Sequence, residues 1–139
     1  MAYSNLLGHT KVRIRQMASL MVGAIALCTV ASTARADINV GVIVSTTGSA
    51  ASLGIPEEQT IRMWPPEMAG EKVNFIILND GSDTTGAVRN ASKLITENNV
   101  DVIIGPSVTP TSLAALEVAG NAKVPMVSLA GGGAIVLPQ

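Results

Sequence analysis

Continuous apolar runs and segments with helical spacing alternate along this chain. A short unbroken apolar run bounded by turn formers is typical of a strand buried on both faces. Such runs predict four strands, at residues 38–44, 72–79, 100–104 and 124–129. Apolar residues that recur every three or four positions predict helices over 56–63, 84–97 and 111–122. A further element can open at 134–137.

The alternation of strands and helices through short connections predicts an α/β fold with a doubly wound parallel sheet. Pro56 suits the first turn of the first helix, where its missing N–H costs nothing, and Glu57 and Glu58 favour the positive helix start. Pro65-Pro66 ends that helix. We expect the buried sides of the two later helices to carry Ala87, Val88, Ala91, Leu94 and Ile95, and Leu113, Leu116 and Ala119 or Gly120.

Residues 1–36 have the three parts of a secretory signal peptide. Basic residues between Lys11 and Arg15 precede an apolar core at 17–30, and Ala34-Arg35-Ala36 forms a small-x-small cleavage site. The apolar core is shorter than the roughly 20 residues of a spanning helix, so cleavage after Ala36 is favoured over an uncleaved anchor. We therefore expect an exported, periplasmic domain at 37–139, with no membrane insertion after cleavage.

Charge and residue usage after position 36 exclude several classes of protein. Five basic residues stand against ten acidic ones, a formal charge of −5, so nucleic acid is not an expected partner. Both Cys28 and His9 lie within the signal peptide. The remaining chain therefore offers no disulfide, no serine-hydrolase triad and no thiol or imidazole ligand for a metal. We expect no cofactor and no enzymatic activity.

Three of the predicted strands open into loops of hydroxyl and glycine residues, at 45–54, 105–109 and 130–133. In open α/β sheets, ligands bind at the carboxyl ends of the strands. Unpaired N–H groups at the starts of the following helices can hold an anion there without lysine or arginine. These loops contain no catalytic acid, base or thiol, so the pattern favours binding of a carboxylate over catalysis.

Other motifs in the sequence give weaker evidence of a function. Gly131-Gly132-Gly133 lacks the G-x-G-x-x-G spacing of a dinucleotide site. Asp80, at a strand end, has the position of a receiver-domain phosphoacceptor, but an Asx turn with Asp80 and Asp83 capping the next helix is the favoured interpretation. Met63 and Trp64 are expected to pack at the end of the first helix.

The stretches DINVGVIVSTTGSAASLGIP (37–56), KVNFIILND (72–80) and VIIGPS (102–107) resemble the opening of periplasmic substrate-binding proteins of the branched-chain amino-acid (Leu/Ile/Val) type. Residues 51–57, the helix broken at Pro65-Pro66 and residues 125–130 are most similar to the branch that takes up aromatic carboxylates. The resemblance implies a type I periplasmic-binding-protein clamshell, of which this chain supplies an incomplete first lobe. It also implies the membrane subunits of an ABC transporter as partners.

The resemblance further implies which residues contact the ligand: Ser52, Leu53, Gly54, Ser107, Val108, Thr109, Ala130, Gly131 and Gly132. Relatives usually carry a serine or threonine where Gly132 stands, so one hydroxyl contact is missing here. They also have two lobes, and we therefore expect a truncated form that cannot close around its ligand. The alternatives are a ligand-sensing domain of an exported receptor, and a receiver-like or hydrolase enzyme on the same sheet.

Overall fold

The computed structural model describes residues 37–136. The expected signal peptide and its cleavage site lie outside the described residues, as does the end of the element expected at 134–137. The described elements, in chain order, are β1 (Ile38–Val44), α2 (Ala51–Arg62), β2 (Glu67–Met68), β3 (Glu71–Asn79), α3 (Thr84–Thr96), β4 (Val102–Ile104), α4 (Thr109–Ala122), β5 (Met126–Val127) and α5 (Gly133–Val136).

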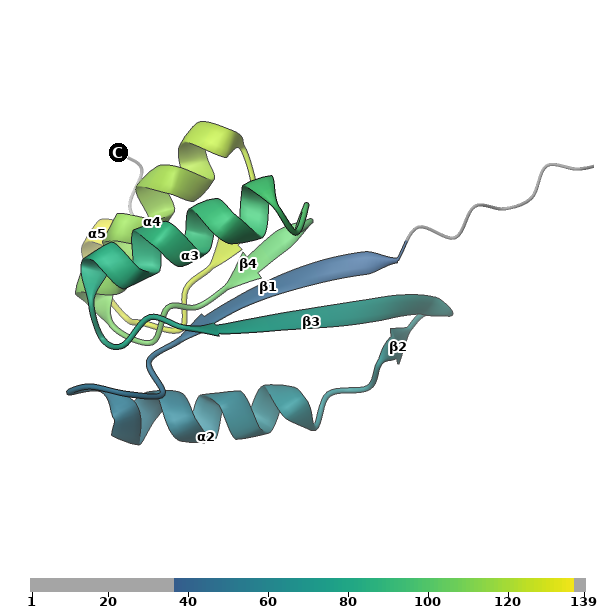
Figure 1. Ribbon diagram of the computed structural model, residues 1–139, viewed down its shortest axis with the longest axis horizontal. Coiled ribbons are helices and arrows are strands. Elements are labelled where there is room, and N and C mark those ends of the chain that lie inside the picture. The colour runs from purple at the N-terminus through teal and green to yellow at the C-terminus, as the bar shows by residue number, and fades with distance from the viewer. Residues whose placement is uncertain (1–36, 137–139) are drawn as a thin grey trace, which may run out of the picture. The chain divides into compact units, whose positions relative to one another are not determined.

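The strands form one sheet in the order β2-β3-β1-β4-β5. β1 is parallel to β3 along its whole length and to β4 from Val40, and β4 is parallel to β5. α2 lies on one side of the sheet, and α3 and α4 lie on the other (Figure 1). This arrangement confirms the doubly wound parallel sheet. The two-residue strand β2, antiparallel to β3 at the edge, was not predicted.

Each side of the sheet has its own hydrophobic cluster. Ile43, Leu94 and Ile103 are fully buried on the α3/α4 side. Val42 and Val44 point to the α2 side and pack with Ile61 of that helix. The side chains of successive β1 residues therefore pack into clusters on opposite sides of the sheet, which explains why the strand is an unbroken apolar run. No helix within residues 37–136 is long and apolar enough to cross a membrane.

The start predicted for the first helix is wrong. α2 begins at Ala51, so Pro56 lies inside the helix rather than in its first turn. The earlier start follows from a turn at Gly48, whose φ of 83° suits glycine, and the N–H of Ala51 donates to the Gly48 carbonyl at 3.3 Å. Pro56 leaves the carbonyl four residues earlier, that of Ser52, without a helical donor.

The predicted buried faces are partly wrong. Ala87, Ala91 and Leu94 are fully buried as predicted, but Val88 and Leu113 are each 38% exposed. α4 begins at Thr109 instead of residue 111, and it turns four small residues inward: Thr111, Ser112, Ala115 and Ala119. The hydroxyl of Ser112 is satisfied in the core because it donates to the Pro106 carbonyl at 3.1 Å. Here a hydrogen bond to the loop before the helix overrides the apolar spacing.

The last two strands are shorter than predicted, at Val102–Ile104 and Met126–Val127. Val100 is buried, but its N–H donates to the carbonyl of Leu94 at the end of α3, so this residue completes the helix instead of joining the sheet. Beyond β5, the hydroxyl of Ser128 accepts the N–H of Ala130 at 3.1 Å and begins a turn. A short helix, α5, does form at the position of the last expected element.

Candidate ligand-binding rim

We use the term rim for the edge of the sheet at the carboxyl ends of β1, β3, β4 and β5, with the loops that follow them. Ser45 lies directly after β1, at the centre of the rim, and it is fully buried. Its hydroxyl donates to Asp80 Oδ1 at 2.7 Å, and its N–H donates to Ser107 Oγ at 3.0 Å. One residue thus connects the ends of three strands.

The connection continues from Ser107 to α2. The Ser107 hydroxyl donates to Glu57 Oε2 at 2.5 Å, and Ser107 is only 5% exposed. The result is a hydrogen-bonded chain in the order Glu57–Ser107–Ser45–Asp80, which we call the rim chain. It joins α2 to the loops after β4, β1 and β3, and it has a carboxylate at each end.

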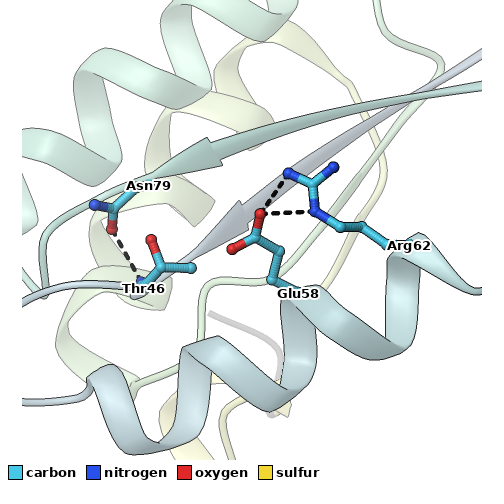
Figure 2. Close-up of polar contacts among 4 residues, drawn as sticks. All are labelled: Thr46, Glu58, Arg62 and Asn79. Carbon is cyan, nitrogen blue, oxygen red and sulfur yellow. Dashed lines mark hydrogen bonds and ion pairs between the residues drawn. The ribbon is translucent and has the colours of Figure 1, made fainter.

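A second set of contacts joins the loops after β1 and β3. The N–H of Thr46 donates to Asn79 Oδ1 at 3.0 Å, and Asn79 Nδ2 donates to Thr47 Oγ1 at 2.8 Å. Figure 2 shows the first of these contacts beside the ion pair on α2, in which the Arg62 guanidinium meets one oxygen of Glu58 at 2.5 and 2.9 Å. The nearby Glu58 is therefore neutralised within its own helix.

The burial and hydrogen bonds of Asp80 indicate a structural role. It is 3% exposed, and its Oδ1 accepts both the Ser45 hydroxyl and the N–H of Ser82, the latter at 2.9 Å. Asp83 is the N-cap of α3 and accepts the N–H of Gly86 at 2.8 Å. These contacts confirm the Asx turn at Asp80 and the cap at Asp83, whereas Asp80 does not cap the helix itself. A phosphoacceptor needs an accessible carboxylate, and Asp80 is not accessible.

The helix starts at the rim differ in their caps. α3 is capped by Asp83, whereas α2 and α4, which begin after Ala50 and Val108, have no side-chain cap. The first N–H groups of a helix have no intrahelical acceptor and lie at the positive end of its dipole. The start of α4 can therefore offer amides to an anion, and at α2 the amide of Ser52 can do so.

The predicted residues Ser52, Leu53 and Gly54 form the first turn of α2. The N–H groups of Leu53 and Gly54 already donate to the Ala50 carbonyl, at 2.9 and 3.1 Å. Gly54 is buried, and a Cβ added there would lie 2.2 Å from the Ser45 carbonyl oxygen, so glycine permits the close approach of α2 to β1. In this turn, Ser52 is the residue whose amide and hydroxyl best suit a ligand.

The other predicted segments, 107–109 and 130–132, lie together. The Thr109 hydroxyl donates to the Gly131 carbonyl at 3.1 Å, and a Cβ on Gly132 would lie 3.1 Å from Thr109 Cγ2. Ser128 joins the same loop to α4 through a 3.0 Å hydrogen bond to Ser112. The first segment reaches this group indirectly, since Gly54 packs on Ser45 and Ser45 bonds to Ser107. The structure thus brings all three predicted segments to one rim.

The predicted contact residues do not include three members of the network. Ser45 was expected in the loop at 45–54 and Asp80 in a turn at a strand end, but the hydrogen bond between them was not predicted. Glu57 was assigned only to a helix start, and nothing local in the sequence points to Ser107, 50 residues away. Trp64 packs edge-on against Phe75, with ring centroids 5.6 Å apart, as expected, but Met63 is 76% exposed.

Hollows on the described surface are small or lie away from this network. One of about 140 Å³ adjoins it and is lined by Glu57, Thr60, Ile61, Trp64 and Leu129. A larger one of about 580 Å³ lies on the outer side of α4, around Leu113 and Glu117. We place the candidate site at the rim because polar groups from the loops after β1, β3 and β4 converge there. Within residues 37–136, no cluster of His, Cys, Asp or Glu could hold a metal ion.

The family model described as "Periplasmic binding protein" matches residues 37–136. The chain therefore belongs to the periplasmic binding protein family. Its sheet and helices match the type I fold of solved members. Comparison with curated proteins gives no match.

Solved relatives agree with this assignment. An extracellular ligand-binding receptor from Rhodopseudomonas palustris HaA2 is 42% identical, with a TM-score of 0.72 over 75% of this chain and 29% of that one. A solute binding protein of an ABC transporter from R. palustris BisB5, in complex with 3,4-dihydroxy benzoic acid, is 35% identical, with a TM-score of 0.67 over 71% and 29%. A leucine binding protein from Thermotoga maritima MSB8 is 28% identical, with a TM-score of 0.64 over 70% and 29%.

The chain spans less than a third of the length of these relatives. The family and the solved relatives are binding proteins, and their names indicate an extracytoplasmic location.

Proposed function

We propose that this chain is the extracytoplasmic solute-binding component of an ABC importer for a small carboxylate, an amino acid or an aromatic acid. In this proposal residues 1–36 direct export, with cleavage after Ala36, and the nine predicted rim residues form the first-lobe half of the site. The single observation that carries the proposal is the convergence on one rim of two uncapped helix starts and the 130–132 loop.

The first turn of α4 is the main anion site. Its amides at Val108, Thr109 and Thr111 lie at the positive end of a helix of 14 residues, and no side chain caps them. Hydrogen bonds from N–H groups to a carboxylate are stronger than bonds between neutral groups. A carboxylate bound there gains both these bonds and the helix dipole, and it needs no basic residue.

Residues 37–136 alone should bind with modest affinity, because they correspond to less than a third of the length of relatives named for such solutes. A ligand held from one side keeps much of its surface in water and has few contacts. We expect dissociation constants of about 1 mM, corresponding to about −4 kcal/mol. The aromatic-acid branch is the more specific form of the proposal, supported by the relative solved with dihydroxybenzoic acid.

Residue-resolved nuclear magnetic resonance tests this function. The full chain is expressed in a Gram-negative host, purified from the periplasm and titrated with 3,4-dihydroxybenzoate, benzoate, leucine and 4-methylpentanoate. We expect saturable amide shifts at 52, 107–109 and 130–132 for at least one acid, with the largest at the start of α4. Absence of any saturable shift up to about 10 mM, or shifts confined to other surfaces, would contradict the proposal.

A further inference from the structure

The hydroxyl of Ser107 is fully committed within the rim chain. Its oxygen accepts the Ser45 N–H at 3.0 Å, and its single proton goes to Glu57 Oε2 at 2.5 Å. A serine hydroxyl has one proton to donate. While Glu57 holds that proton, Ser107 cannot donate to the carboxylate of a ligand. At this point the rim therefore presents an acceptor, in contrast to the N–H donors at the start of α4.

Among residues 37–136, no cation forms an ion pair with Glu57. The ion pairs of the described residues join Arg62 to Glu58 and Lys72 to Asp37, and neither pair includes Glu57. At the other end of the rim chain, Asp80 adds a second acidic group. A solute carboxylate is therefore repelled near Glu57 and attracted by the α4 amides, which begin at Val108, the residue after Ser107.

We propose that Glu57 is a specificity-determining residue, which selects solutes that carry a hydrogen-bond donor, an ammonium or a phenolic hydroxyl, in addition to their carboxylate. This inference rests on the proposed function, because the carboxylate is held by the α4 amides. The hollow of about 140 Å³ beside Glu57 is lined mainly by apolar atoms, so it suits the hydrocarbon part of such a solute. Leucine and 3,4-dihydroxybenzoate both combine a carboxylate with such a donor.

Matched pairs of acids test the inference on the full chain purified from the periplasm. Leucine is compared with 4-methylpentanoate, which lacks the ammonium, and 3,4-dihydroxybenzoate is compared with benzoate. We expect the natural chain to prefer the donor-bearing member of each pair by about tenfold, or about 1.4 kcal/mol. Glu57→Gln keeps an acceptor oxygen for Ser107 but removes the charge, and it should reduce the preference to about threefold or less.

Glu58→Gln is the control, because Glu58 is the neighbouring residue and is already paired with Arg62. It should leave the preference unchanged. Glu57→Asp retains the charge and should retain the preference, which gives a second readout if Glu57→Gln does not fold. An unchanged preference in folded Glu57→Gln, or its loss in folded Glu57→Asp, would overturn the inference.

The two proposals fail in different ways. A natural chain that binds both members of each pair equally contradicts the role of Glu57 and leaves the proposed function in place. A natural chain that binds none of the four acids contradicts the proposed function, and the role of Glu57 falls with it.

Discussion

Replacing Gly54 by alanine tests whether the close contact between α2 and β1 positions the rim. The added Cβ would lie 2.2 Å from the Ser45 carbonyl oxygen and 2.7 Å from the Ser45 nitrogen. Ordinary contact begins near 3.4 Å, so α2 or the end of β1 must move by roughly 1 Å. Both contacts are backbone atoms, which cannot rotate away as a side chain can.

The expected cost combines two opposing effects. Forcing extra atoms into a packed site costs about 1–3 kcal/mol or more, and alanine recovers about 1 kcal/mol over glycine through helix propensity. We expect a net loss of about 1–2 kcal/mol in the free energy of unfolding. For a domain of this size, that loss corresponds to a fall in Tm of roughly 4–15 °C.

Gly120→Ala is the matched control. Gly120 also lies in a helix, α4, but an added Cβ would meet nothing within 4 Å. Helix propensity should therefore raise the stability of this variant by up to about 1 kcal/mol. Both variants are compared with the natural chain by urea unfolding monitored by circular dichroism. If Gly54→Ala is as stable as the natural chain, the argument that glycine sets this contact is wrong.

Three further predictions concern Asp80, Asp37 and Val108. Asp80→Asn should lower stability by about 1–2 kcal/mol in urea unfolding, because it weakens the hydrogen bonds to Ser45 and Ser82. A covalent label on Asp80 after incubation with acetyl phosphate would instead support an enzyme. Hydrogen bonds from Lys72 and then Asn74 hold the pKa of Asp37 below its usual range, so its stabilising effect is present at neutral pH and lost as the pH falls through that lowered pKa. Urea midpoints of Asp37→Asn and the natural chain should therefore differ at pH 7 and converge once the pH falls below that lowered pKa. Val108→Asp should cap α4 through the Thr111 N–H and raise stability by about 1 kcal/mol, yet weaken carboxylate binding at least about tenfold in the resonance titration. Unchanged binding in this variant would show that the α4 amides do not hold the ligand.

The sequence predicts the four parallel strands because each has a local signal. β1 is buried on both faces and appears as an unbroken apolar run, and the hydroxyl and glycine loops follow directly from the strand ends. Two helical features depend instead on hydrogen bonds to the loop that precedes each helix. Ser112 faces inward because Pro106 accepts its hydroxyl, and α2 starts early because of a turn at Gly48. Neither contact can be seen in a periodic pattern.

The residue types of the rim loops could be predicted, but which of their groups donate and which accept hydrogen bonds could not. Ser107 was expected to contact the ligand, as the resemblance implies. The structure gives its proton to Glu57, a residue on a different element and 50 positions away. Serine hydroxyls serve as donor or acceptor according to their neighbours. A site built from such groups therefore acquires its selectivity only after the chain folds.

The pattern of helix caps connects stability with binding. α3 begins with Asp83, a strong N-cap whose side chain accepts a first-turn amide. The N-cap position of α4 is occupied by Val108. Its backbone is extended, which suits a cap, but its side chain cannot accept a hydrogen bond. An aspartate or serine there would stabilise the helix, so the protein with valine at this position is about 1 kcal/mol less stable than it could be. That loss has a physical reason if the first-turn amides of α4 are reserved for the carboxylate of a solute.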